Sequence, residues 1–498
     1  MMTPITRCFA AAGVAMLLAA GVGGCASTRG LSAHGTLVAP ASLHAGRSLA
    51  ADAAQGEGKG PSPEWWKHFD DPQLDALVDE ALAGNPDLAL AIARARGAAA
   101  AAGAANAERL PTLGAGTSAA GAKIPGSAIP APIGGHFAIF RYGYLSFRWG
   151  IDWTGERRDA WAAALGAARA AAIDSDAARI LLTANVVQAY ITLQGAYRLH
   201  DLDEQDVARD KELLSLTTQR AKAGIDSDFQ LVQIRGEAAA ARATATAGRH
   251  EVERAGVTLA VLLGKGPDRA LSIARPEPLP DTAVPVPTAV TADLIGKRPD
   301  VVAARWRVEA AGKGVAAARA AFLPNIDVSA LAGLIAGPGS SLLRALSFGY
   351  QAAPAISLPI FDGGRLRAGL SARNADWDEA VALYDKTVIA AINEIAMDHD
   401  ALRTLDAQFD DARLAFDSAR HAWDLAMQRY RGGIGSYLEA LSVREQLIAA
   451  ERALARLEIA RASAAVALIE SLGGGYSPDA DARALVAAPA ADIGSRTP

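Results

Sequence analysis

The 498-residue sequence is short of cysteine, of basic clusters and of long apolar segments, and each shortage excludes a class of protein. Of its two cysteines, Cys8 lies in an apolar N-terminal segment, so Cys25 has no partner for a disulfide bond. The net charge of −5 and the lack of basic runs argue against binding to nucleic acid. Beyond the N-terminus no stretch of about 18 apolar residues remains, so only strands could span lipid.

The N-terminus has the features of a bacterial lipoprotein signal. A basic start at Arg7 precedes an apolar run from Phe9 to Val22, and "VGGC" ends at Cys25. We therefore predict a signal peptide over 1–24, acyl chains on Cys25 as the only covalently bound group, no other cofactor, and a lipidated linker over 25–62. Ala26 resembles the second residue of lipoproteins that are sent to the outer membrane. An ordinary signal peptide with an incidental cysteine is the alternative.

The chain contains one unit twice. "NPDLALAIAR" from Asn85 and "RPDVVAARWR" from Arg298 have the same pattern, and each is followed 25 residues after its proline by a second proline, in "ERLPTL" and "AFLPNI". "QRAKAGIDSDFQ" around Gly224 and "QRYRGGIGSYLE" around Gly433 also correspond. This spacing indicates a tandem duplication. We assign a first repeat to 63–265, a Pro-rich linker to 266–290, a second repeat to 291–474 and a tail, expected to be flexible, to 475–498.

Each repeat contains segments that alternate with a period of two. In "YLSFRWGIDW" the apolar side chains Phe147, Trp149 and Ile151 lie on one face, while Arg148 and Asp152 lie on the other. In "FGYQAAPAISLPI" the apolar face holds Tyr350, Ile356 and Leu358, and Gln351 takes the opposite face. Such alternation with aromatic residues is typical of membrane-spanning strands, with the apolar side toward lipid and the other toward a pore. A strand of a soluble sandwich is the alternative.

Proline is absent from two long stretches, Arg157 to Ala223 and Arg365 to Arg431. Each predicts a helix of 67 residues, or roughly 100 Å at ~1.5 Å per residue. The second stretch follows a heptad pattern, which indicates coiled-coil packing; its core positions are Leu402, Leu405, Phe409, Ala412, Phe416, Ala419, Trp423, Ala426 and Tyr430. Gly224 and Gly433 end these helices. "SDFQ" and "SYLE" then begin returning helices with capping boxes.

Two strands per repeat give four per chain, and four strands cannot close a barrel in lipid, so the chain must oligomerise. The duplicated plan, the segment "WWKHFDDPQLDALVDEALAGNPDLALAIAR", "PIFDGGR" and "YRGGIGSYLEAL" together resemble the TolC-like outer membrane efflux proteins, in particular the lipoproteins that serve resistance-nodulation-division pumps. The resemblance implies a mixed α/β membrane protein: a homotrimer whose twelve strands form one outer-membrane β-barrel, continued by a long periplasmic α-helical coiled-coil barrel.

The same resemblance implies a function. The trimer would be the outer membrane channel of a tripartite efflux system, which receives drugs or other small toxic compounds from an inner-membrane pump through a periplasmic adaptor, the membrane fusion protein. Outer membrane lipid would surround it. A channel for type I protein secretion is one alternative, and a lipidated periplasmic coiled-coil adaptor or scaffold is another. No enzyme is expected: "DHD" at Asp398–Asp400 fits a charged helix face better than a metal site, and we find no phosphate loop or nucleophile elbow.

The two helical tips are the expected functional sites. By resemblance, the periplasmic gate residues would be Tyr430, Gly433, Glu439 and Ser442, with Ser442 at a position where many relatives have aspartate. Ser436 and Glu439 also form a capping box, so a purely structural role for Glu439 is the alternative. Adaptor contacts are expected at the exposed tip residues Gly224, Asp226, Asp228 and Gly435.

Overall fold

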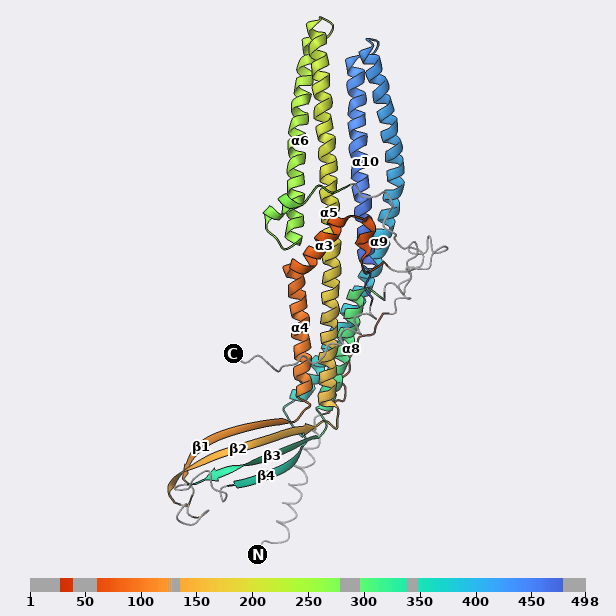
Figure 1. Ribbon diagram of the computed structural model, residues 1–498. Helices are drawn as coiled ribbons and strands as arrows, with labels where there is room; N and C mark the ends of the chain where they lie inside the picture. Colours follow the sequence, from red (N-terminus) through yellow and green to blue (C-terminus); the bar gives the residue numbers. More distant parts are fainter. Residues whose placement is uncertain are drawn as a thin grey trace. The chain divides into compact units, whose positions relative to one another are not determined.

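The computed structural model describes residues 27–38, 61–123, 125, 127, 135–277, 296–337 and 348–477 (Figure 1). Cys25, the predicted signal peptide, most of the predicted Pro-rich linker and nearly all of the tail lie outside these residues. The chain divides into two compact units, and each takes segments from both repeats. The first comprises 1–37, 94–171 and 303–385, and the second comprises 38–93, 172–302 and 386–498.

The first unit contains a four-stranded antiparallel sheet in the order β1-β2-β3-β4 (Figure 1). The strands are β1 (Thr112–Lys123), β2 (Phe137–Ile151), β3 (Asn325–Ala336) and β4 (Phe348–Ser357). Each repeat supplies one hairpin, and the two hairpins are joined by the pairing of β2 with β3. The outer edges of β1 and β4 have no partner strand among the described residues.

The register divides the sheet into an apolar and a polar face. Directly paired residues share a face, and Trp149 pairs with Val328, which pairs with Pro354. On the same face, Phe147 lies level with Ala330 and Ala352, and Leu145 with Ala332 and Tyr350. We call this the apolar face. The opposite, polar face carries Thr112, Ser118, Tyr142, Tyr144, Ser146, Arg148, Asp327, Ser329 and Gln351.

The register corrects two residues of the predicted strands. Asp152 follows the end of β2, and its carboxylate accepts hydrogen bonds from the backbone N–H groups of Arg157 (3.1 Å) and Arg158 (2.7 Å). It is therefore a cap for the start of helix α5 (Glu156–Lys222) and not a strand residue on the polar face. Leu358 lies beyond β4, which ends at Ser357. Both errors arise because alternation in sequence continues past the point where the ladder of backbone hydrogen bonds stops.

The helices of the first unit pack closely through small and aromatic residues. A Cβ on Gly166 of α5 would lie 3.0 Å from Cβ of Ala310 on α8 (Pro299–Ala320). The guanidinium of Arg169 lies 4.6 Å from the ring centroid of Trp306. The described N-terminal segment 27–38 lies against α9 (Arg365–Arg431), where Oδ1 of Asp378 accepts hydrogen bonds from the backbone N–H groups of His34 (2.8 Å) and Gly35 (2.7 Å).

Helix α4 (Pro86–Ala107) changes one expectation of the sequence analysis. It is long and apolar enough to cross a membrane, with a mean hydropathy of 1.2, because alanine dominates its second half. Our prediction that no such helix exists was therefore wrong by the criteria of length and composition. One helix of this kind is weak support for a membrane span, since α4 also contains Arg94 and Arg96.

The second unit contains the two long helical hairpins and the core that connects them. The hairpins are α5 with α6 (Asp228–Leu262) and α9 with α10 (Tyr437–Ser471) (Figure 1). Both α5 and α9 are 67 residues long, as predicted. Three of the predicted core positions on α9, Phe409, Ala426 and Tyr430, are buried, and the other six are half-buried.

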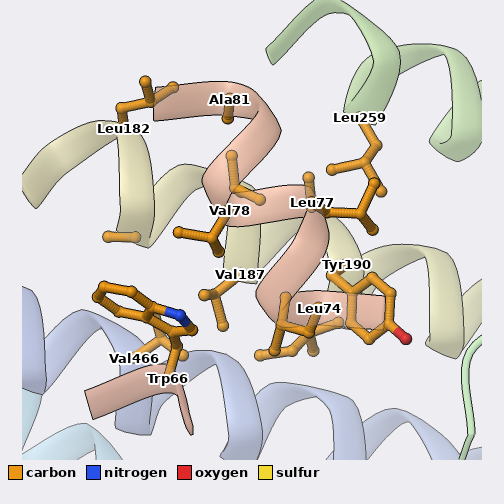
Figure 2. Close-up of a cluster of buried hydrophobic side chains, with 14 of the residues drawn as sticks. Trp66, Leu74, Leu77, Val78, Ala81, Leu182, Val187, Tyr190, Leu259 and Val466 are labelled. Carbon is orange, nitrogen blue, oxygen red and sulfur yellow. The ribbon is translucent and has the colours of Figure 1, made fainter. Parts of the chain in front are cut away.

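A cluster of buried apolar side chains centres on the short helix α3 (Pro72–Gly84) (Figure 2). Leu74, Leu77, Val78 and Ala81 occupy one face of α3, at the spacing of an amphipathic helix. They pack with Trp66 of η2 (Trp65–Phe69) and with residues of α5, α6 and α10; those labelled in Figure 2 are Leu182, Val187, Tyr190, Leu259 and Val466. A further short helix, η3 (Pro267–Ser272), follows α6 and is fixed to α3 by an ion pair of 2.8 Å between Arg269 and Glu80. This cluster joins helices from both repeats.

The duplicated "NPD" and "RPD" motifs have the same structural role. In the first repeat, Nδ2 of Asn85 donates a hydrogen bond of 2.9 Å to the carbonyl of Leu262, the last residue of α6. In the second, Nη1 of Arg298 donates one of 2.6 Å to the carbonyl of Ser471, the last residue of α10. Each bond satisfies a carbonyl that the end of a helix leaves without an intrahelical partner. These bonds join the end of α6 to the start of α4 in the first repeat, and the end of α10 to the start of α8 in the second.

Glycine is required at this junction. Gly264 has a φ of +69°, and a Cβ there would lie 2.3 Å from the carbonyl oxygen of Gly84. Gly473, at the equivalent place in the second repeat, has a φ of +95°. Both residues follow the end of a helix in the left-handed region, where side chains with a Cβ are strained.

Asn85→Ala should lower the free energy of unfolding by about 2–3 kcal/mol, because Oδ1 of Asn85 also accepts from the N–H groups of Asp87 (2.8 Å) and Leu88 (3.1 Å) at the start of α4. Denaturant unfolding followed by circular dichroism measures the change. Asn393→Ala is the control, since its amide bonds only to its own helix, and it should change stability by less than about 0.5 kcal/mol. Equal effects of the two substitutions would contradict the role of Asn85.

Candidate functional site

Both long hairpins turn through the same backbone motif. At the first tip Gly224 has a φ of +72°, its N–H bonds to the carbonyl of Ala221, and the N–H of Ile225 bonds to that of Arg220. At the second tip Gly433 has a φ of +75°, and the bonds run from Gly433 to Tyr430 and from Ile434 to Arg429. This is the Schellman arrangement, in which a left-handed glycine satisfies the last carbonyls of a helix.

The helices that follow the tips begin with side-chain caps. The N–H of Ser227 donates a bond of 2.6 Å to Oε1 of Gln230, and Oγ of Ser436 accepts one of 3.1 Å from the N–H of Glu439. The carboxylate of Glu439 lies 3.6 Å from Nε of Arg429, and both side chains are about half exposed. Ser436 therefore caps α10 as predicted, but only half of the predicted capping box is present, because the carboxylate of Glu439 lies in a solvent-exposed ion pair with Arg429.

A buried polar contact links the two tips. The carboxylate of Asp226 accepts hydrogen bonds from Nε of Arg220 (2.9 Å) and from the hydroxyl of Tyr430 (3.2 Å). The guanidinium of Arg220 also lies 4.7 Å from the ring centroid of Tyr430. Burial raises the pKa of the Tyr430 hydroxyl, with the neighbouring Asp226 adding to the shift, so the hydroxyl stays protonated and donates. We call these three residues the tip link.

The tip link corrects the prediction for Asp226. We expected an exposed residue for adaptor contact, but only 4% of its side chain is exposed, because Arg220 and Tyr430 both hold its carboxylate. Gly435 is half-buried, and a Cβ there would lie 3.0 Å from Cβ of Arg429. Asp228 begins α6 with an exposed side chain, and Ser442 is exposed on α10.

The exposed tip surface also carries large apolar side chains. At the first tip Ile225, Phe229 and Val232 are each at least 64% exposed, and at the second Ile434 is 80% exposed. We call these four the apolar tip residues. Sequence reasoning missed them, although an apolar residue directly after each tip glycine was a visible signal. Exposed apolar side chains grouped at one end of a helical hairpin suit contact with another protein.

A second polar site lies between α5, α6 and α10. Nη2 of Arg444 lies 2.6 Å from Oδ1 of Asp210, and less than 5% of either side chain is exposed. Arg444 also lies 3.6 Å from Glu237 on α6. Arg452 contacts Asp203 at 2.7 Å and Asp206 at 3.2 Å. Arg209 contacts Glu451 at 2.8 Å. We call these residues the buried ion-pair cluster: Asp203, Asp206, Arg209, Asp210, Glu237, Arg444, Glu451 and Arg452.

The buried ion-pair cluster fastens one hairpin to the other. Its carboxylates lie mainly on α5, and two of its three guanidinium groups lie on α10, so its attractions cross between the repeats. Burial raises the pKa values of Asp203, Asp206, Asp210 and Glu237, while the nearby arginines act in the opposite direction. Removing water from a carboxylate is costly unless a partner compensates, so each arginine here is needed by its neighbours.

Within the described ranges, no group of three or more His, Cys, Asp or Glu side chains has an arrangement that could hold a metal ion. His399, the histidine of "DHD", lies within α9 between Asp398 and Asp400. Burial raises the pKa of Asp398.

A sequence model of the family described as outer membrane efflux protein matches residues 77–265 and 290–474, one match in each copy of the repeat. The chain belongs to this family. Among its relatives, the efflux protein is 35% identical to the fusaric acid resistance protein FusA of Burkholderia cepacia over 71% of this chain and 67% of that one. It is 30% identical to the multidrug resistance outer membrane protein MdtP of Shigella flexneri over 91% of this chain and 94% of that one.

Solved structures agree. The efflux protein matches the outer membrane protein VceC of Vibrio cholerae with a TM-score of 0.78 and 33% identity, covering 84% of this chain and all of that one. It matches the outer-membrane channel OprN with a TM-score of 0.79 and 28% identity, covering 91% and 99%. The predicted fold class, outer-membrane localisation and efflux family are confirmed.

Arg444→Met should lower the free energy of unfolding of the efflux protein by about 3–5 kcal/mol, because it leaves the buried carboxylate of Asp210 without its partner. Denaturant unfolding in detergent measures the loss. The double substitution Asp210→Leu with Arg444→Met should recover a large part of it, since the deeply buried carboxylate of Asp210 is then removed together with its partner. Arg456→Met, at an exposed position of α10, is the control. A loss no larger than that of the control would show that the cluster does not hold the hairpins together.

Proposed function

We propose that three copies of this chain form one outer membrane exit channel of a tripartite efflux system. The observation that carries the proposal is the sheet register, which gathers most of the large apolar side chains of the four strands on one face and, among the described residues, leaves both sheet edges unpaired. Open edges are not tolerated in lipid, and four strands are too few for a closed barrel. Joining β4 of one copy to β1 of the next, three times, gives twelve strands in one closed wall.

The helical hairpins would continue this wall into the periplasm and meet a periplasmic adaptor there. The apolar tip residues offer the adaptor a surface on each hairpin, and exposed Asp228 adds a charge beside it. An inner-membrane pump of the resistance-nodulation-division type would supply the compounds. MdtP is named for multidrug resistance, and OpmQ of Pseudomonas aeruginosa, 30% identical, for pyoverdine export. Both names concern compounds far smaller than proteins, which favours drugs and other small toxic compounds as cargo.

The proposed channel is a passage and not an enzyme. Compounds would move through it without a covalent step, so it would need neither a catalytic group nor a cofactor. Its selectivity would arise from the width of the pore and the charges along it.

The tips would form the periplasmic gate, with the tip link holding it closed. The hydroxyl of Tyr430 bonds to Asp226 of the other hairpin, so the hairpins cannot separate at this end without breaking that bond. Gly433 ends the helix that bears Tyr430, while Glu439 and the exposed Ser442 follow on α10. Threefold symmetry would bring three copies of Glu439 around one axis, where their carboxylates would attract cations.

Tyr430→Phe should favour the open channel, because it removes a hydrogen bond of about 0.5–1.5 kcal/mol from the closed form alone. Single-channel recording in a planar bilayer should show a larger open fraction, and Tyr384→Phe, elsewhere on α9, is the matched control.

Recordings of Glu439→Gln test the ring of charge: cation selectivity and cation block should weaken. If both variants gave the same recordings as the wild type, the gate would not lie at the tips. A trimer without any conductance would refute the channel itself.

Cys25 would anchor the mature chain through acyl chains, each buried CH₂ contributing ~0.8 kcal/mol. The segment that follows it, 27–38, lies against α9, which would keep the anchor close to the barrel. Cys25→Ala should abolish palmitate labelling while part of the channel activity remains, because the barrel holds the protein in the membrane independently. Mass spectrometry of the mature wild-type protein that finds residue 25 unmodified would exclude the anchor.

A further inference from the structure

The apolar face of the sheet carries two charged residues, and both are positive. Lys123 is the last residue of β1, and Arg141 lies on β2. The register places Arg141 opposite Ala119 and Lys123 opposite Phe137, on the same face as Leu145, Phe147 and Trp149. No other charged residue occurs on this face among the residues of the four strands.

The two cations lie in the half of the sheet next to the β1–β2 connection. Lys123 lies four steps along the strand from Ala119, which is ~13 Å at ~3.3 Å per residue. Long side chains can close such a gap onto one ligand. Helix α4 precedes β1 and helix α5 follows β2, so both helices join the sheet at the end that lies away from the β1–β2 connection. If those helices are periplasmic, the cations lie toward the outside of the cell.

Aromatic side chains mark the depth of these cations in the membrane. Phe348 is level with Leu334 and Gly143, and Tyr350 is level with Ala332 and Leu145. Both aromatic residues are exposed on the apolar face. Barrels in the outer membrane carry such girdles where hydrocarbon meets headgroups. Arg141 lies on this face between the level of Phe348 and that of Phe137, which is also exposed and pairs with Lys123, so both cations lie within this aromatic girdle, at the level of the headgroups.

The two hairpins of the sheet and their connections contain no acidic residue beside these cations. The sequence contains no Asp or Glu between Pro111 and Ile151, or between Val328 and Phe361, and these two stretches include both hairpin connections. They do contain Lys123, Arg141, Arg148 and Arg344. Asp152 and Asp327 lie near the other end of the strands, where Asp327 pairs with Gly150. The same stretches of further copies add only more positive charge, so an anion from outside the protein would complete the site.

We propose that Lys123 and Arg141 bind the phosphate groups of the glycolipid in the outer leaflet, which is lipopolysaccharide in this membrane. The inference rests on the proposed function, because it requires the sheet to be part of an outer-membrane barrel. A guanidinium donates a fork of hydrogen bonds that matches phosphate, and an ammonium adds a second, mobile charge. A lipid-facing cation costs far less close to the interface than at the bilayer midplane, and a bound phosphate offsets that cost.

The test measures binding of fluorescent lipid A with two phosphates to the purified full-length protein in detergent. Lys123→Gln with Arg141→Gln should bind at least about tenfold more weakly, since two charge-assisted contacts are lost. Lys123→Arg with Arg141→Lys should keep most of the affinity. Arg148→Gln, on the polar face of the same strand, is the matched control and should bind like wild type. Dephosphorylated lipid A should bind wild type as weakly as it binds the double glutamine variant.

Three results would overturn the site: unchanged binding by the glutamine variant, an equal loss in Arg148→Gln, or displacement of lipid A by equimolar inorganic phosphate. The comparison of phosphorylated with dephosphorylated lipid A uses the wild-type protein alone, so it holds even if a variant fails to fold. Channel recordings on the same preparations separate the two hypotheses. A protein that conducts but does not distinguish the two lipids would refute the lipid site, whereas one without conductance would refute the channel.

Discussion

Backbone hydrogen bonding in lipid is the constraint on which the rest of the structure depends. Each hairpin of the sheet satisfies its inner edge with the other hairpin, through the pairing of β2 with β3, and in the part of the chain that the structure describes this leaves the outer edges of β1 and β4 open. In a membrane an open edge costs several kcal/mol for each unsatisfied group. Neither repeat can therefore stand alone, and one chain cannot either. The duplication removes half of the open edges, and assembly with further copies would remove the remainder.

The helical part meets a comparable problem by different means. A helix end leaves its last carbonyls without partners, and a returning helix of 35 residues that stopped in the middle of a bundle would bury them. Here the residue before a proline donates to that last carbonyl in both repeats, from Asn85 to Leu262 and from Arg298 to Ser471. Proline itself fits the first turn of the next helix, where no N–H is required. In each repeat one junction therefore holds both the end of the returning helix (α6 or α10) and the start of the helix that begins with the proline (α4 or α8).

Much of the fold could be predicted because its signals are local. Helix ends follow from Gly224 and Gly433, long helices from the absence of proline, and strand faces from a period of two in "YLSFRWGI". The limits of this reasoning appear where the signal continues beyond the structure, as at Asp152, which alternates correctly but caps a helix. They also appear in α4, where many small apolar residues reach the hydropathy of a membrane span without a run of large ones.

The candidate sites were less predictable because their partners are distant in sequence. Tyr430 lies 204 residues from Asp226, and no local pattern shows that this carboxylate faces inward. Asp203, Asp206 and Asp210 are spaced like an ordinary solvated helix face. Arg444 and Arg452 of α10, which pair with these carboxylates, lie more than 230 residues later in the sequence. Lys123 and Arg141 can be read from the sequence as two basic residues. Only the strand register shows that both lie on the apolar face of the sheet.

The junction residues Asn85 and Arg298 also bear on how internal duplications are recognised. An amide and a guanidinium share no side-chain chemistry beyond an N–H donor, yet each makes the same bond to the last carbonyl of a helix. Counting identical letters between the two halves would score this pair as a mismatch. The two halves share a side-chain donor in the residue directly before a proline. They also share a glycine shortly after the end of the returning helix. An internal duplication of this kind is therefore easier to detect from the spacing of its proline and glycine residues than from the number of identical side chains.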